Sequence, residues 1–328
     1  MSGVKCTSKR IIAAVLMAAL WLSGCGAVKV PFSYKENNDV SAFQVTSLNH
    51  EVKMDAFAAA LCVGNANVTK NTSVDMSEAS AAALFDVNGS NIIYAKNLHE
   101  RLYPASLTKV LTAVVALKNA NPEEVITVTQ EAMINESGAA LCGLEPGDTL
   151  TLNQALHALL INSANDAANA IAVHVAGSVE EFARMMNEEA RSLGATNSSF
   201  VNPHGLSDDN HYTTAYDLYL IFNEAIKYEM FREIIHMSSY ETVYQDKEGK
   251  EKEMSFSTTN LFLRGEYNAP GKVTVIGGKT GTTNAAGNCL IILSKDTAGN
   301  PYISVILRAK ERKIMYEEMV DMLEEIYN

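Results

Sequence analysis

Strand-like segments at both ends of the body of this chain, separated by a long helical stretch, constrain its fold most strongly. The first pair of such segments is formed by residues 81–87 and 92–95, two apolar runs separated by Asn88-Gly89. An Asn-Gly pair between two β-prone runs is the strongest short-range signal for a hairpin. The sequence therefore predicts that the body opens with two antiparallel strands.

Between residue 106 and about residue 235 the sequence changes to long stretches rich in alanine and leucine. Segments 107–119, 152–176 and 179–193 have the length and apolar spacing of helices. We interpret this block as a helical region inserted after the first strands.

Strand-like segments return near the end of the chain. These β-prone runs lie at residues 240–245, 253–257, 273–279, 287–295 and 302–309. Residues 310–327 then have an apolar stripe at helical spacing and are expected to close the chain as a helix. The pattern predicts an α+β fold, in which N-terminal and C-terminal strands form one antiparallel sheet and the helical lobe is inserted between them. A functional site is expected where the lobe meets the sheet.

Three short motifs with nucleophilic chemistry occur in order along this arrangement. They are S-x-x-K at residues 106–109, S-x-N at residues 163–165 and K-T-G at residues 279–281. Each is short enough to occur by chance, but the ordered set is far less so. Together the motifs contain the groups that a lysine-assisted serine acyl-enzyme needs.

The first motif supplies a candidate nucleophile and its base. Ser106 and Lys109 are three residues apart, so on a helix they share a face and Lys109 Nζ can reach Ser106 Oγ. Pro104 suits a helix start, which directs backbone N–H groups and the positive end of the helix dipole toward the serine. The ordinary pKa of a lysine, about 10.4, is too high for a base, but burial and a cationic neighbour such as Lys279 lower it.

The second motif places polar side chains inside an otherwise apolar helical pattern. Ser163 and Asn165 interrupt a segment that looks buried, and buried polar groups need hydrogen-bond partners. We expect Ser163 to relay a proton between Lys109 and a leaving amine. Asn165 is expected to hydrogen-bond Lys109 and a substrate carbonyl, whereas Asp166 is expected to be structural.

The third motif, Lys279-Thr280-Gly281, follows an apolar strand-like run that is rich in glycine. Glycines on a strand permit close approach of a ligand backbone, so a substrate is expected to lie alongside as an added strand. Lys279 supplies positive charge for a terminal carboxylate, and Thr280 and Thr282 supply hydroxyls. The backbone N–H groups of Ser106 and Thr282 are the candidate oxyanion hole.

This set of motifs resembles that of the active-site serine penicillin-recognising enzymes, and the surrounding sequence resembles the D-alanyl-D-alanine carboxypeptidases among the low-molecular-mass penicillin-binding proteins. Besides the motifs, the matching passages lie at residues 102–106, 165–169, 202–206, 213–218 and 286–290. The resemblance implies a fold like that of β-lactamases and transpeptidases. It also implies removal of the terminal D-alanine from peptidoglycan stem peptides through an acyl-Ser106 intermediate, slow trapping by β-lactams, and no metal or other cofactor.

Two alternative functions compete with this interpretation. A class A β-lactamase shares the motif order, but such enzymes typically show Ser-Asp-Asn where this chain has Ser163-Ala164-Asn165, and carry an E-x-x-L-N string with a deacylating glutamate. The corresponding region here, residues 202–206, reads Asn-Pro-His-Gly-Leu. The second alternative is a non-catalytic module that binds cell wall or β-lactams, against which the intact motifs argue.

The histidines offer no competing mechanism. None has a recognisable acid–base partner at informative spacing, so each is expected to be structural. This expectation covers His157, His174, His204 and His211.

The N-terminus has the pattern of a bacterial export signal. Basic residues precede an apolar run at residues 11–22, which is short for a spanning helix of about 20 residues. Leu-Ser-Gly-Cys at residues 22–25 resembles a lipobox, so Cys25 is expected to become a lipidated N-terminus, with an ordinary secretory signal as the alternative. Such an anchor would replace the C-terminal domain and membrane-surface helix that many relatives carry. The predicted organisation is a signal peptide over 1–24, a lipidated tether and lead-in over 25–78, and a catalytic domain over 79–328, anchored outside the cytoplasm.

Export also bears on the cysteines of the mature chain, Cys62, Cys142 and Cys289. No pair has the spacing of metal ligands, so a zinc site is not expected. Cys289 lies in an apolar strand-like run and is expected to be a buried small hydrophobe, which leaves Cys62 and Cys142 as a candidate disulfide. The net charge of −12 and the lack of a basic stripe argue against a nucleic-acid partner.

Overall fold

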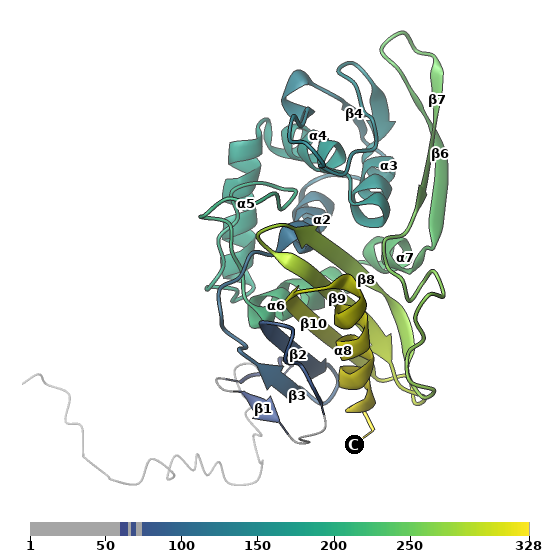
Figure 1. The fold of residues 1–328 in the computed structure, drawn as a ribbon. Coiled ribbons are helices and arrows are strands. Elements are labelled where there is room, and N and C mark those ends of the chain that lie inside the picture. The colour runs from purple at the N-terminus through teal and green to yellow at the C-terminus, as the bar shows by residue number, and fades with distance from the viewer. Residues whose placement is uncertain (1–59, 65–66, 70–73, 328) are drawn as a thin grey trace, which may run out of the picture. The chain divides into compact units, whose positions relative to one another are not determined.

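Two antiparallel sheets and a set of helices make up the computed structural model, which describes residues 60–64, 67–69 and 74–327 (Figure 1). These residues belong to one of the two compact units into which the chain divides, 55–328. The predicted signal peptide, Cys25 and the first part of the tether lie outside the described residues. No helix in the described part of the chain has the length and apolar content needed to cross a membrane.

The larger sheet joins strands from the two ends of the body. In spatial order its strands are β1 (Val68–Thr69), β3 (Asn91–Lys96), β2 (Ala81–Asp86), β10 (Pro301–Ala309), β9 (Gly287–Lys295) and β8 (Thr274–Thr283). All neighbouring pairs are antiparallel. The predicted α+β fold, with a sheet completed by both ends of the body, is confirmed, and β8 forms one edge of that sheet.

The helices lie between and around these strands. They are η1 (Ala105–Leu107), α2 (Thr108–Asn119), η2 (Gln130–Ala132), α3 (Leu152–His157), η3 (Ala158–Asn162), α4 (Asn165–Ala176), α5 (Val179–Ser192), α6 (Ala215–Ala225), α7 (Glu229–His236) and α8 (Arg312–Glu324). Here η1 and η2 are short 3₁₀ turns, and η3 is a π-helical turn.

Alternate residues of β2 face two separate hydrophobic cores. Ala83 and Phe85 pack into the core shared with the helical lobe, whereas Ala82 and Leu84 pack into a smaller core beneath α8. Successive side chains of a strand point to opposite faces, so a strand that is covered on both faces is apolar throughout. This explains why the central strands appear in the sequence as continuous apolar runs.

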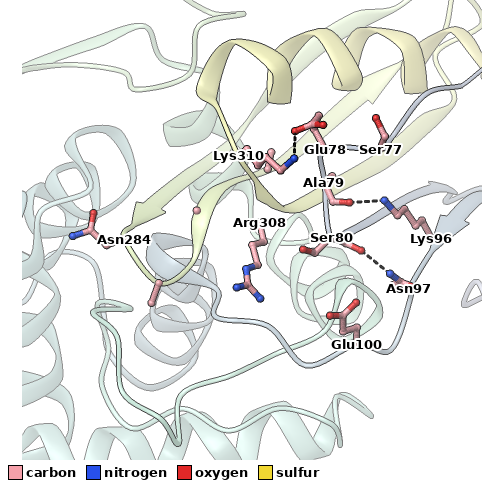
Figure 2. Close-up of a pocket in the computed structure, with 13 residues that line it drawn as sticks. Ser77, Glu78, Ala79, Ser80, Lys96, Asn97, Glu100, Asn284, Arg308 and Lys310 are labelled. Carbon is pink, nitrogen blue, oxygen red and sulfur yellow. Dashed lines mark hydrogen bonds and ion pairs between the residues drawn. The ribbon is translucent and has the colours of Figure 1, made fainter.

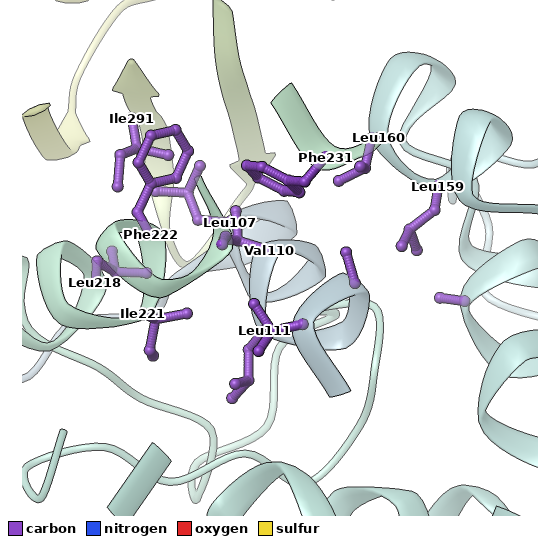
Figure 3. Packing of buried hydrophobic residues seen from close by; sticks show 14 of the residues in the cluster. Leu107, Val110, Leu111, Leu159, Leu160, Leu218, Ile221, Phe222, Phe231 and Ile291 are labelled. Carbon is purple, nitrogen blue, oxygen red and sulfur yellow. The ribbon is translucent and has the colours of Figure 1, made fainter. Parts of the chain in front are cut away.

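Helix α2 runs through the middle of the helical lobe, and its residues from Thr108 to Ala116 are all buried. Figure 3 shows Val110 and Leu111 of this helix among side chains from α6, α7, η3 and β9. Because apolar neighbours surround the helix, it lacks the polar face of a surface helix. The lobe therefore holds the first turn of α2, which follows Ser106, in a fixed position.

One predicted helix, 152–176, is divided in the structure. The helical hydrogen bonds widen to a π-helical turn in η3, Ser163 then takes a left-handed backbone with φ of 65°, and α4 begins at Asn165. A single non-glycine residue in the left-handed region is enough to end a helix, and composition does not reveal it.

The strands predicted over 240–245 and 253–257 form and pair with each other, but they belong to a second sheet rather than to the single sheet that was expected. That sheet contains β4 (Val125–Thr127), β5 (Thr149–Thr151), β6 (Ser239–Gln245) and β7 (Glu251–Ser257). Its first two strands lie within the segment that was interpreted as helical. Strands of three residues are too short to give a periodic pattern, so the sequence did not indicate them.

Part of the predicted lead-in segment packs against the body. Strand β1 pairs with β3, and Cys62 is buried in the larger core. The backbone N–H of Cys62 donates to Tyr219 Oη at 3.0 Å, and Tyr216 Oη donates to the Cys62 carbonyl at 2.9 Å. Residues before position 79 thus contribute to the stability of the body.

The candidate disulfide between Cys62 and Cys142 is wrong, because both are free thiols, as is Cys289. Cys62 Sγ contacts the carbonyl of Asp86, whereas Cys142 Sγ contacts the carboxylate of Asp166. The two thiols therefore belong to different parts of the fold. Cys289 is fully buried, as predicted, and burial raises its thiol pKa to about 12.

We expect reductant to leave the melting temperature of the protein unchanged, because no bond between cysteines stabilises the described fold. The measurement is thermal unfolding with and without dithiothreitol. Alkylation under denaturing, non-reducing conditions should label Cys62, Cys142 and Cys289 in full by peptide mapping. An unlabelled pair would contradict the structure.

Candidate active site

The three motifs meet where the helical lobe joins the edge strand β8. Ser106 lies in η1, immediately before α2, and Ser163 lies in the break before α4. Lys279 and Thr280 lie on β8. The structure brings together residues that are more than 170 positions apart in the sequence.

Lys109 is fully buried at the centre of this group. Its Nζ lies 3.1 Å from Ser106 Oγ, and it donates hydrogen bonds of 2.6 Å to both Asn165 Oδ1 and the backbone carbonyl of His204. Burial, followed by the charge of Lys279, holds the pKa of Lys109 well below the ordinary lysine value. A neutral amine has two N–H donors and one lone pair. Asn165 and His204 accept the two donors, so the lone pair faces the hydroxyl of Ser106.

The backbone that presents Ser106 is held in an unusual conformation. Ala105 has a left-handed backbone with φ of 47°, and its carbonyl accepts a hydrogen bond of 2.8 Å from Thr108 Oγ1. Thr108 Oγ1 in turn lies 2.8 Å from Nε2 of the buried His211. A Cβ at Gly205 would come within 1.8 Å of the Ala105 oxygen, so only glycine fits there.

Neither histidine near the site is suited to act as a base. The backbone N–H of Val201 donates to His211 Nδ1 at 3.2 Å, so Nε2 carries the proton and donates to Thr108. Burial lowers the pKa of His204 to about 3 and that of His211 to about 4, so both imidazoles are neutral at neutral pH. Sequence reasoning expected structural histidines but missed the His204 carbonyl, since a backbone acceptor leaves no signal in residue type.

Ser163 is paired with Lys279 rather than with Lys109. Lys279 Nζ donates to Ser163 Oγ at 2.9 Å and to the carbonyl of Thr280 at 2.8 Å. Lys279 is 1% exposed, and this burial lowers its pKa to about 7. Within the described residues no hydrogen bond joins Ser163 to Lys109, so the predicted relay has no direct contact with the base in this structure.

Asp166 fixes the loop beside the second motif. Its carboxylate accepts backbone N–H groups from Cys142, Gly143 and Leu144 at distances of 2.9 to 3.1 Å. The neighbouring backbone N–H of Asn165 donates to the carbonyl of Ala140 at 2.8 Å. The carboxylate thus has the structural environment that was expected of it.

Strand β8 packs directly against the backbone of the nucleophile. A Cβ at Gly281 would lie 2.9 Å from the backbone nitrogen of Ser106, so a side chain at this position would displace η1. Thr280 Oγ1 lies 2.6 Å from Thr259 Oγ1, and Thr282 Oγ1 donates to Asn288 Oδ1 at 3.3 Å. Thr259 was not found from the sequence, because it belongs to no motif.

The described part of the site contains no set of side chains suited to a metal ion. Among the described residues, no group of three or more His, Cys, Asp or Glu side chains is placed to hold a metal ion. The polar groups around Ser106 are instead two amines, an amide, hydroxyls and backbone groups, which suit acyl transfer to a serine.

The sequence of this chain is similar to a known family of peptidases. Residues 67–311 match the model of the D-alanyl-D-alanine carboxypeptidase family, peptidase S11. The chain is 35% identical over 262 residues to the D-alanyl-D-alanine carboxypeptidase DacF of Bacillus subtilis, which covers 77% of this chain and 64% of that protein. It is 33% identical over 257 residues to DacC of Escherichia coli, covering 75% and 60%. The chain thus spans about three fifths of the length of these curated relatives.

The fold is also similar to that of a solved structure. The DD-transpeptidase of Streptomyces K15 superposes with a TM-score of 0.70 at 26% identity, covering 79% of this chain and 98% of that one. The family model covers all three motifs and most of the body. The chain therefore belongs to the D-alanyl-D-alanine carboxypeptidase family, peptidase S11.

Proposed function

We propose that this protein removes the C-terminal D-alanine from peptidoglycan stem peptides through an acyl-enzyme on Ser106. The observation that carries the proposal is the environment of Lys109, whose Nζ faces Ser106 Oγ at 3.1 Å while Asn165 and His204 take its other hydrogen bonds. Family membership supports the choice of substrate.

In the proposed first step, neutral Lys109 accepts the Ser106 proton as Oγ attacks the carbonyl carbon of the penultimate D-alanine. The N–H groups of Ser106 and Thr282 would hold the oxyanion, and one such donor is typically worth about 3 kcal/mol. Collapse breaks the peptide bond, and the proton on Lys109 passes to the departing amine. Ser163 is proposed to relay it, which requires the Ser163 hydroxyl to turn from Lys279 toward Lys109. Water then attacks the ester by the reverse sequence, which releases the shortened peptide and restores the Ser106 hydroxyl.

The open edge of β8 is the proposed binding strand for the substrate. Among the described strands β8 pairs only with β9, so its other edge can accept an extended peptide. The positive charge of Lys279 is proposed to attract the terminal carboxylate, with the hydroxyls of Thr280 and Thr282 and the amide of Asn165 as further contacts. The close approach of Gly281 to Ser106 supports this position, because a peptide along β8 would then lie beside the nucleophile.

Two measurements test this function. The protein should release D-alanine from a synthetic pentapeptide ending in D-alanyl-D-alanine, and penicillin should leave a long-lived adduct that mass spectrometry maps to Ser106. Deacylation should be slow because the 202–206 loop presents the backbone carbonyl of His204 to Lys109. A carbonyl, unlike a carboxylate, cannot act as a base for the deacylating water. Rapid multiple turnover of penicillin would instead favour a β-lactamase.

Replacing the base separates an enzyme from a non-catalytic binding module. Lys109→Ala should lower the rate of D-alanine release by about 10³-fold, within the usual range for losing a general base. The matched control is Lys118→Ala on the same helix, whose side chain is 51% exposed and paired with Glu189. Peptide binding that is unaffected by Lys109→Ala, with no D-alanine release by the parent protein, would point to a binding module.

The rate of acylation should depend on pH through both lysines. Neutral Lys109 is the active form, so the rate falls as pH drops through its lowered pKa. Lys279 loses its charge as pH rises past its pKa of about 7, which weakens attraction of the substrate carboxylate on the alkaline side. Because the charge of Lys279 lowers the pKa of Lys109, Lys279→Met should move the acidic limb of kcat/KM to higher pH. An acidic limb that stays in place would refute this coupling.

We also propose that the protein acts outside the cytoplasm and is held at the membrane by a lipid on Cys25. The lipobox-like residues 22–25 support this proposal. Cells that express the chain should incorporate labelled palmitate into it and retain it in the membrane fraction. Cys25→Ala should abolish labelling and release the protein, and an unmodified mature N-terminus at another residue would contradict lipidation.

A further inference from the structure

A polar pocket of about 700 Å³ lies apart from the motif residues, at one end of the large sheet (Figure 2). Its walls come from the segment before β2, the loop after β3, the β8–β9 turn and the end of β10. The charged residues that line it, together with one amide side chain, are Glu78, Lys96, Glu100, Asn284, Arg308 and Lys310. None of the three motifs contributes a side chain to it.

Arg308 is the cation of this pocket that forms no side-chain hydrogen bond or ion pair with the described residues. Figure 2 shows its guanidinium directed into the pocket, and no hydrogen bond or ion pair of the described residues involves that group. The other two cations are engaged: Lys310 Nζ pairs with Glu78 at 2.8 Å, and Lys96 Nζ donates to two backbone carbonyls at 2.6 Å each. Arg308 therefore has its full set of N–H donors available to a ligand.

The backbone at Arg308 is strained. Its φ is 56°, in the left-handed region, and the pairing of β10 with β9 shifts register between Ile306 and Ala309. Glycine would adopt this conformation without a steric cost, whereas arginine does not. An arginine that is held in a strained conformation and makes no bond within the described protein is more typical of a functional side chain than of a stabilising one.

The strained segment is connected to the candidate active site. Asn288 Nδ2 donates to the carbonyls of Ala309 and Lys310 at 3.2 Å each, and Asn288 Oδ1 accepts from Thr282 Oγ1 at 3.3 Å. Asn284, which lines the pocket, is two residues beyond Thr282. At about 3.4 Å per residue, a peptide lying along β8 can reach the pocket within a few residues of the bond that is cut.

We propose that this pocket binds a carboxylate of the substrate chain that lies outside the terminal D-alanyl pair, with Arg308 as its direct partner. The inference rests on the proposed function. The planar guanidinium matches a carboxylate with two parallel hydrogen bonds. Among the residues that line the pocket, Lys96 adds a second positive charge, the charge of Glu78 is offset by Lys310, and Glu100 remains as an opposing carboxylate. The pocket is thus locally cationic within a chain of net charge −12.

The test measures binding to the full chain carrying Ser106→Ala, so that peptides are not consumed. Two fluorescent peptides ending in D-alanyl-D-alanine are compared, identical except for one upstream residue, glutamate or glutamine, scanned over the positions that precede the terminal pair. At one position the glutamate peptide should bind about fivefold more tightly, as suits an ion pair that remains partly exposed. Arg308→Gly should remove this preference and leave the affinity of the glutamine peptide unchanged.

Three further variants and measurements distinguish the pocket from general electrostatics. The double variant Lys310→Gln/Glu78→Gln removes the ion pair from the same wall but should keep the preference, because that pair adds no net charge to the pocket. Glu100→Gln should increase the preference by removing the opposing carboxylate. Arg308→Gly should melt at the same temperature as the parent or higher, since it relieves backbone strain.

Equal binding of both peptides at every position, or a preference that survives Arg308→Gly, would overturn the inference. A melting temperature lowered by several degrees in Arg308→Gly would also overturn it, because the side chain would then be structural. Failure of the proposed function has a different signature: the parent protein would release no D-alanine from either peptide. A glutamate preference in that case would still support the pocket as a carboxylate site.

Discussion

The burial of two lysines side by side is the constraint on which the rest of the site depends. Lys109 and Lys279 are both nearly inaccessible, and a charge on either one disfavours a charge on the other. The fold resolves this by surrounding Lys109 with uncharged acceptors, Asn165 Oδ1 from the start of α4 and the carbonyl of His204 from a distant loop. An amine held neutral in this way can accept a proton from Ser106, which an exposed lysine cannot do at neutral pH.

Local departures from regular helix bring both serines to the sheet. Ser106 follows a left-handed residue, Ala105, and lies in a 3₁₀ turn, whereas Ser163 is itself left-handed and follows a π-helical turn. Non-glycine residues in such conformations persist only where the surroundings hold them. The conformation of Ala105 is stabilised by the hydrogen bond from Thr108 to its carbonyl, by the bond between Thr108 and His211, and by the close packing of Gly205. Arg308, in β10 of the same sheet, is a further left-handed residue.

Much of the fold could be predicted where a segment has a long and consistent pattern. Residues 287–295, predicted as a strand from continuous apolar character, form β9 with the same bounds. The helix predicted over 152–176 was wrong at Ser163, because one residue's backbone dihedral angle depends on what packs around it. The three-residue strands β4 and β5 were missed, since their stability comes from pairing with each other and with β6.

The sequence by itself determined which reactive groups are present and predicted the family, because the order and composition of three motifs specify those groups. Tertiary structure alone decided how those groups are paired. It placed Ser163 on Lys279 rather than on Lys109, supplied the His204 carbonyl as an acceptor, and kept Cys62 and Cys142 apart as free thiols. Such contacts join segments that are distant along the chain. The distances between these groups are therefore set by packing of the whole body and cannot be predicted from the local sequence.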